Sequence, residues 1–576
     1  MTDTLVIRGG TIVDGTGGAP YGADVAIAGD RIAAIGHGLP KGDREIDACG
    51  KLVTPGFVDI HTHYDAQATW ASHISPSSWN GVTTVLIGNC GVGFAPCRPE
   101  QRDMLVKLME GVEDIPEVVL TEGLPWNWQT FPEFLDALDA RRYDIDVATQ
   151  VPHSAVRVYV MGERGANREA ATEDDRNRMA RIVAEGLRAG ALGFATSRTI
   201  AHKTLAGDHV PTLRAAEAEL AAIGQGMRGA GAGWMQVISD FDDPEAEFGI
   251  LRRVAEGSGR PMTFSLLQRE RRPHLWRELL DKVAEANRAG LDMKAQVMGR
   301  PIGLMFGFEI SQNPFIGRPS WREVKHLGFA AKLGKLRTPE FRARLLAEET
   351  TDPAMKSRLE SWANIFPLND PLDYEPPPEA SVAARAAREG RDPQDVVYDM
   401  LLEKDGRAIL YRPIINYADG TLDVVKLMLE DPNTLIGLGD GGAHVGIICD
   451  ASTMTHTLTH WARDRTRGPR MKLEWVVRRL TSDNAAAIGL CDRGVLAPGY
   501  KADVNVIDFD RLMVHAPEVL YDLPSGGRRL VQRTAGYTAT IVSGVPVYRN
   551  GEATGELPGR LVRGAKRPVV LPLAAE

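Results

Sequence analysis

The chain has 576 residues, of which 43% are hydrophobic and 25% charged, a globular composition that excludes disordered, collagen-like and coiled-coil proteins. Its 67 basic and 76 acidic residues give a formal net charge of −9, which is a poor match for a nucleic-acid partner. Because no apolar run approaches the roughly 18 residues of a membrane span, and the N-terminus lacks a basic signal-peptide start, we expect a cytoplasmic protein without membrane partners.

Residues 1–54 predict a run of short antiparallel strands. Segments such as Asp24–Ala28 alternate polar and apolar side chains, and glycine-containing turns separate them. The same pattern returns near the C-terminus, for example in Thr538–Ser543. We therefore predict that residues 1–54 and 485–576 together form one β-sandwich.

Residues 55–484 predict an α/β fold, because short apolar strands alternate with helical segments such as Glu173–Ala189 and Leu275–Arg288. Eight strands are expected: Gly56–Ile60, Thr83–Ile87, Asp146–Val151, Ala191–Thr196, Trp234–Ser239, Met262–Leu267, Asp292–Val297 and Thr434–Leu438. Eight strand–helix units indicate a closed (β/α)8 barrel of the TIM type.

A long insertion, residues 298–433, separates the seventh and eighth predicted strands. Its length of about 135 residues far exceeds an ordinary strand–helix connection. It contains Trp321, Trp362 and Phe366 and several helical segments. We interpret it as a lid or substrate-pocket subdomain, and the alternative is an insert that serves oligomerisation.

His61 and His63 follow the first predicted barrel strand directly, in the sequence Asp-Ile-His-Thr-His. Alternation along an extended chain points both imidazoles to the same side, here the inside of the barrel. Two imidazoles at the C-terminal end of a barrel strand are typical metal ligands. The spacing therefore predicts a metal site.

The segment Gly56-Phe-Val-Asp-Ile-His-Thr-His63 resembles the first-strand motif of the amidohydrolase superfamily, and residues 481–503 resemble its return from barrel to sandwich. Ile87-Gly-Asn-Cys-Gly-Val-Gly-Phe-Ala-Pro96 is similar to the N-acyl-D-amino-acid deacylase (D-aminoacylase) branch. This resemblance implies a TIM barrel beside a β-sandwich built from both termini. It also implies a zinc-activated water that attacks an amide carbonyl.

The resemblance assigns roles to two further residues. Cys90 matches the metal-bridging cysteine, and zinc accepts mixed nitrogen and sulfur ligands. Asp440, at the end of the eighth strand, matches the catalytic aspartate. A carboxylate there accepts a proton from the attacking water and returns it to the leaving amine. His444 is expected to orient the substrate or to be a structural loop residue.

The fifth and sixth strands depart from the family pattern, in which each carries a histidine of a second zinc site. Neither Trp234–Asp240 nor Met262–Gln268 contains one, and Asp240 and Gln268 are weak replacements. We therefore expect one zinc ion per chain, with two as the alternative, and these ligands: His61, His63, Cys90 and Asp440. Gln268 also replaces a lysine that holds the substrate carboxylate in the family, so a free N-acyl-D-amino acid is not assured as the substrate.

Several polar residues follow barrel strands and are candidates for substrate binding, because the loops after the strands build a barrel's active site. His153 and His202 are candidates to polarise the scissile carbonyl. Arg198, Arg269 and Arg300 are candidates to hold a carboxylate, and the alternative for each is an ordinary ion pair. His456 and His460 are interpreted as a pair on a helix surface.

Together these features predict a metal-dependent amidohydrolase that cleaves a linear amide, an N-acyl amino acid or related N-acyl amine. The aromatic residues of the insertion suggest a bulky or apolar acyl group. The first alternative is a hydrolase of a cyclic amide, a lactone or a xenobiotic amide. The second is a catalytically inactive homologue that binds ligands, and the resemblance further implies a homo-oligomer.

Overall fold

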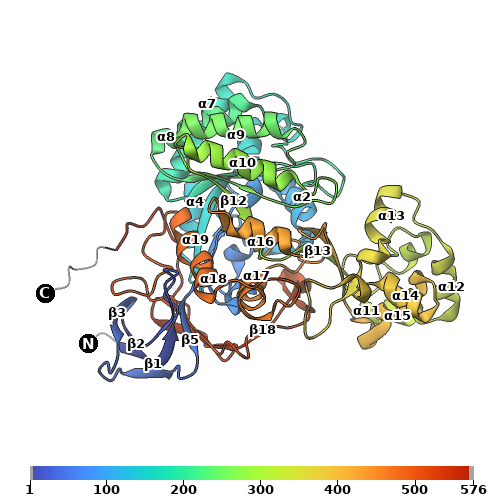
Figure 1. The fold of residues 1–576 in the computed structure, drawn as a ribbon. Coiled ribbons are helices and arrows are strands. Elements are labelled where there is room, and N and C mark those ends of the chain that lie inside the picture. The colour runs from blue at the N-terminus through green and yellow to red at the C-terminus, as the bar shows by residue number, and fades with distance from the viewer. Residues whose placement is uncertain (1–3, 214, 570–576) are drawn as a thin grey trace.

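The computed structural model describes residues 4–213 and 215–569, and an eight-stranded parallel sheet forms its centre (Figure 1). In spatial order its strands are β16 (Thr434–Ile436), β12 (Met293–Val297), β11 (Met262–Ser265), β10 (Trp234–Ser239), β9 (Gly193–Arg198), β8 (Asp146–Pro152), β7 (Val82–Ile87) and β6 (Phe57–Asp59). The two edges meet just beyond their strands, where Thr62 bridges Gly441 in parallel and His63 N donates to Gly441 O at 2.7 Å. The sheet therefore curls into a TIM-like barrel, and all eight predicted strands are present in the predicted order.

Helices surround this sheet, and their ends follow ordinary capping rules. The principal outer helices are α7 (Glu173–Ala189), α8 (Glu217–Ala230), α9 (Pro244–Ser258), α10 (Leu275–Arg288), α16 (Asp423–Glu430) and α18 (Leu473–Leu480). The Thr172 side chain caps α7 by accepting from the backbone of Asp175, and Gly190 ends it. The other helices of this part of the chain are α1 (Gln67–Trp70), α2 (Arg102–Glu113), α3 (Glu117–Gly123), α4 (Phe131–Asp139), α5 (His153–Met161), α6 (Glu163–Ala166), α17 (Thr453–Thr459) and α19 (Ser482–Ala487). Among the described residues, none of the helices combines the length and apolar character that crossing a membrane requires.

Both ends of the chain contribute to a second sheet, which lies beside the barrel (Figure 1). Its order is β24 (Glu552–Ala553), β23 (Val545–Arg549), β22 (Tyr537–Val542), β17 (Val504–Ile507), β5 (Leu52–Pro55), β1 (Thr4–Ile12), β2 (Tyr21–Ala28) and β3 (Arg31–Gly36), with β4 (Arg44–Asp47) also on β1. The termini join where β17 pairs antiparallel with β5. Two small pairs accompany it: β18 (Met513–Val514) with β21 (Thr534–Ala535), and β19 (Glu518–Leu523) with β20 (Gly527–Val531). The common sheet of the two termini is confirmed, and its division into sandwich layers stays a prediction.

A buried ion cluster ties the barrel to the C-terminal segment. Arg493 Nη1 lies 2.7 Å from Asp146 Oδ2 on β8, and Lys501 Nζ lies 3.1 Å from the same oxygen. Burial alone would raise the pKa of Asp146, but Lys501 and Arg493 outweigh it and hold that pKa below 3.8. Asp146 of the barrel and the two cations of the C-terminal segment therefore neutralise one another in a buried position.

Replacing Arg493 with alanine is expected to lower the free energy of unfolding by about 3–5 kcal/mol, because it leaves a buried carboxylate with a single cation. Denaturant unfolding at neutral pH measures this. In the wild type the contribution of Asp146 is present above pH 3.8 and is lost as the pH falls through its depressed folded-state pKa. Arg478→Ala is the control, since that arginine pairs with Asp483 at the surface and should contribute at most about 1 kcal/mol. Equal losses for both variants would contradict the expectation.

The insertion between β12 and β16 forms a lobe at the side of the barrel (Figure 1). It comprises a small sheet, β13 (Ile302–Phe306), β15 (Leu410–Ile415) and β14 (Phe366–Pro367), with helices α11 (Phe329–Leu336), α12 (Pro339–Ala347), α13 (Pro353–Leu359), α14 (Val382–Glu389) and α15 (Pro393–Gly406). Trp321 and Phe366 are buried in the lobe's own core, and Trp362 packs against that core. These aromatic residues therefore give no support to the suggestion of a bulky acyl group, because packing of the lobe accounts for them.

The base of this lobe lies beside the loop that follows β16. Met305 N donates to Ile447 O at 2.8 Å, and Ser311 N donates to Gly446 O at 3.2 Å. The lobe is therefore anchored next to the residues that follow Asp440. Its role as a lid or an oligomerisation insert stays a prediction.

Candidate metal centre

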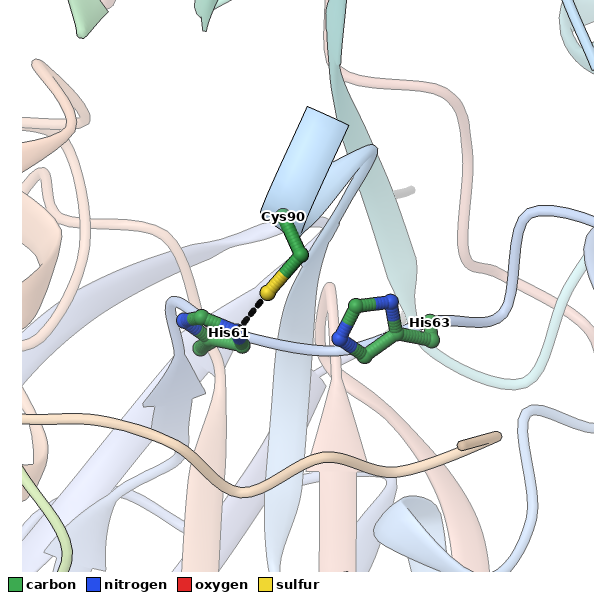
Figure 2. Close-up of side chains that lie close together, drawn as sticks. All are labelled: His61, His63 and Cys90. Atoms are coloured by element: carbon green, nitrogen blue, oxygen red, sulfur yellow. Dashed lines mark hydrogen bonds between the residues drawn. The ribbon is translucent and has the colours of Figure 1, made fainter. Parts of the chain in front are cut away.

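Three potential metal ligands meet at the C-terminal end of the barrel. His61 and His63 follow β6, Cys90 follows β7, and one ligand atom from each lies within 4.8 Å of the others. Figure 2 shows Cys90 directed toward His61, with Sγ 3.4 Å from Nε2. All three residues are buried. The predicted trio is therefore brought together by two neighbouring strands.

Asp440 joins the two histidines from the opposite edge of the sheet. Its Oδ1 lies 3.5 Å from His61 Nε2 and 3.7 Å from His63 Nε2. The backbone N–H of Asp440 donates to His61 O at 2.9 Å, so closure of the barrel fixes this approach. Strand ends that are far apart in the sequence thus supply nitrogen, sulfur and oxygen donors to one point.

The outer nitrogen of each imidazole faces a protein oxygen. His61 Nδ1 lies 2.8 Å from Gln296 Oε1, and His63 Nδ1 lies 3.1 Å from Glu113 Oε1. Because Gln296 Oε1 can accept a hydrogen bond from His61 Nδ1, the proton of the His61 ring belongs on Nδ1 and the lone pair on Nε2. The Nε2 atoms are the ones that face Asp440, which is the arrangement of metal-binding histidines. The donor set of two imidazoles, a thiol and a carboxylate suits zinc.

The surroundings are rich in buried carboxyl groups. Burial raises the pKa of Asp59 and of Asp65 to about 7, and it raises the pKa of Glu113 and Asp440 well above the usual range. Within the part of the chain that the structure describes, none of these four pairs with a lysine or arginine. A bound cation would offset this negative charge and lower the pKa of each group, including that of the Cys90 thiol, which burial raises.

The backbone around the centre is unusual. Cys90, Leu438, Asp440 and His444 have φ values of 54°, 60°, 44° and 49°, a left-handed region that non-glycine residues seldom adopt. Such conformations cost free energy and cluster where a structure must aim a functional group. The concentration of four of them here supports a functional role for the centre.

His202 and His444 lie at the same site. Burial first, and then the charge of His444, lower the pKa of His202 to about 3, and burial lowers that of His444 to about 4. His444 Nε2 lies 3.9 Å from Glu113 Oε2, and His202 Nδ1 lies 2.9 Å from Ser197 Oγ. Both imidazoles are therefore neutral near pH 7, and each places one nitrogen close to a protein oxygen.

Three other candidates have partners within the protein. His153 Nδ1 lies 2.8 Å from Thr196 Oγ1, and its Nε2 lies 2.9 Å from Glu219 Oε1. Arg198 forms a two-pronged ion pair with Glu247. Arg300 lies 2.9 Å from Asp450 Oδ1 and stacks 4.1 Å from the Tyr374 ring. These contacts favour structural roles over substrate binding for all three.

Neither proposed replacement for the missing histidines is free. Asp240 accepts hydrogen bonds from Thr199 Oγ1 at 2.7 Å and Ile200 N at 2.7 Å, and pairs with Arg269. Gln268 Nε2 donates to Asp419 Oδ2 at 2.8 Å. Asp240 and Gln268 therefore support loops, and Arg269 is occupied by Asp240.

The interpretation of His456 and His460 as a surface pair is wrong. His456 is 7% exposed, and its ring stacks on that of His460 with centroids 4.9 Å apart. The His456 ring also makes a T-shaped contact with Tyr374 of the insertion, with centroids 5.1 Å apart, and His460 Nε2 lies 3.3 Å from Glu375 Oε2. Both histidines therefore contact the insertion, which the spacing of two histidines does not reveal.

Three residues that support the candidate ligands were not predicted from the sequence: Glu113 on α2, Gln236 on β10 and Gln296 on β12. Gln236 Oε1 accepts from the Cys90 backbone N–H at 2.8 Å. One signal was available, because Glu113 falls on the same helical face as the apolar Leu105 and Met109. A glutamate in that position is buried, and a buried glutamate needs a partner.

The chain belongs to the amidohydrolase family, since the family model described as "Amidohydrolase family" matches residues 44–548. Its curated relatives include the D-aminoacylase of Alcaligenes xylosoxydans xylosoxydans, 28% identical over 97% of each chain. They also include an N-acyl-D-glutamate deacylase of the same organism, 26% identical over 97% of this chain and 96% of that one. A solved structure of D-aminoacylase with a binuclear metal centre superposes with a TM-score of 0.64 at 24% identity, over 98% of this chain and 100% of that chain. The predicted resemblance to the D-aminoacylase branch is confirmed.

Proposed function

We propose that this protein is a zinc-dependent amidohydrolase that cleaves the linear amide of an N-acyl amino acid or related N-acyl amine. The observation that carries the proposal is the convergence of His61, His63 and Cys90 with Asp440 at the barrel mouth. The full-length relationship to D-aminoacylase and an N-acyl-D-glutamate deacylase supports the amide substrate. The metal site itself favours an enzyme over the alternative of an inactive ligand-binding homologue.

The centre holds one zinc ion in this proposal. Barrel strands β10 and β11 carry no histidine, and the adjacent Asp240 and Gln268 are occupied by loop contacts. A study of D-aminoacylase attributes activation to one metal of its binuclear centre and attenuation to the second. A single ion is therefore compatible with hydrolysis in a relative of similar fold.

The protein residues divide the chemistry among them. Zinc bound there would lower the pKa of a water molecule and polarise the amide carbonyl. Asp440 takes the proton that the water loses and delivers it to the leaving amine, because its carboxyl group lies beside both histidines of the centre. His202 and His444 are neutral, so each can donate a hydrogen bond to the carbonyl oxygen without adding a charge.

The proposal is tested by metal content and substrate range measured together. The purified protein is expected to contain about one zinc ion per chain, and chelation should abolish activity that zinc restores. The substrate panel holds N-acyl amino acids of both hands, with a cyclic amide and a lactone as alternatives. About two ions per chain would mean that a second site exists, and preference for the cyclic substrates would support the first alternative. No metal and no hydrolysis would favour the ligand-binding homologue.

A further inference from the structure

Helix α2 ends with a buried carboxylate at the edge of the metal centre. Glu113 is 1% exposed, and its Oε1 lies 3.1 Å from His63 Nδ1, while Oε2 lies 3.9 Å from His444 Nε2. No arginine or lysine among the described residues pairs with it. Its two oxygens therefore face one imidazole of the centre and one imidazole of the loop that carries Asp440.

The end of α2 also holds that loop through its backbone. Val445 N donates to Glu113 O at 3.2 Å, and Gly446 N donates to Asp114 Oδ2 at 3.1 Å. Asp114 terminates the helix with φ of 53°, which turns the chain at this point. The same short segment thus contacts both His63 from β6 and the loop after β16.

The two histidines of the centre have different supports. His61 faces the neutral amide of Gln296, whereas His63 faces the carboxylate of Glu113. A bound cation would favour the ionised form of Glu113, and an anionic oxygen beside Nδ1 orients the ring and makes Nε2 a stronger donor to a metal than a neutral acceptor does. In a metal-bound centre Glu113 is therefore placed where it strengthens one ligand selectively.

We propose that Glu113 is the positioning residue of the centre. It holds His63 with Nε2 toward the metal, and it fixes the position of the loop that carries Asp440 relative to His63. The inference rests on the proposed function in one respect, that the centre binds a metal ion. It adds a residue on a helix outside the barrel strands, which strengthens metal binding without touching the metal.

The test compares Glu113→Gln and Glu113→Asp with wild type and with Asp103→Asn, an exposed carboxylate on the same helix. Zinc affinity is measured by competition with a chromophoric chelator, and the visible absorption of the cobalt-substituted protein reports ligand geometry. Glu113→Gln is expected to weaken zinc binding by about 10- to 100-fold and to shift the cobalt spectrum, with Asp103→Asn unchanged. Glu113→Asp keeps the charge and should fall between them.

Thermal unfolding of the metal-free proteins separates positioning from folding. A positioning role predicts similar midpoints without metal and a smaller gain on adding zinc for Glu113→Gln. Wild-type affinity and spectrum in Glu113→Gln would overturn this inference and leave the proposed function standing. Wild-type protein that binds neither zinc nor cobalt would overturn both.

Discussion

Replacing Asp440 with asparagine is expected to lower kcat/KM for the preferred N-acyl substrate by about 10²- to 10⁴-fold, the range for loss of a general acid–base group. Asparagine preserves the shape of the side chain and its left-handed turn, but it cannot take a proton from water or return one to the amine. Steady-state kinetics with saturating zinc measures the loss. Both kcat and kcat/KM should fall, because the proton transfer belongs to the chemical step.

The zinc content of the same variant separates the two roles of Asp440. With His61, His63 and Cys90 intact, Asp440→Asn should still bind zinc, although more weakly. Asp281→Asn on the exposed side of α10 is the matched control and should behave as wild type. Full activity in Asp440→Asn would exclude this carboxyl as the proton carrier, and complete loss of zinc would identify it chiefly as a ligand.

The barrel could be predicted because each strand is short, apolar and followed by a helix. Predicted Asp292–Val297, for instance, appears as β12 (Met293–Val297), and predicted Gly56–Ile60 appears as β6 (Phe57–Asp59). A parallel strand that is buried on both faces needs apolar side chains throughout, so it appears in the sequence as a short, continuous apolar run. The position of the insertion beside the barrel could not be predicted in this way, because its amphipathic helices are compatible with many arrangements around a barrel.

The candidate metal ligands could be predicted because they lie at strand ends in recognisable motifs. Their supporting partners were not, since they come from segments far away in sequence: His61 and Gln296 are 235 residues apart. Arg198 and Arg300 illustrate the same difficulty, because an arginine after a barrel strand suits a substrate carboxylate or a protein one equally well. Only the positions of Glu247 and Asp450 decide between these roles.

Removing the His61 imidazole is expected to abolish both zinc binding and hydrolysis. Its Nε2 faces Cys90 Sγ at 3.4 Å and Asp440 Oδ1 at 3.5 Å, so this ring contacts both the sulfur and the oxygen donor. Losing about 4 kcal/mol of transition-state stabilisation would already reduce kcat/KM by about 10³-fold. Elemental analysis and kinetics of His61→Ala measure the two effects, with His326→Ala, on an exposed part of the insertion, as control.

The Cys90→Ala variant tests whether the Cys90 thiol binds zinc or only packs beside the histidines. If the thiol binds zinc, its loss should lower zinc content and activity in parallel, although less than His61→Ala does, because two imidazoles and Asp440 remain. Cys49→Ala, at an exposed position, controls for loss of a thiol elsewhere. Unchanged metal content and rate in Cys90→Ala would assign the thiol to packing, whereas unchanged metal content in His61→Ala would remove the basis for the centre as a whole.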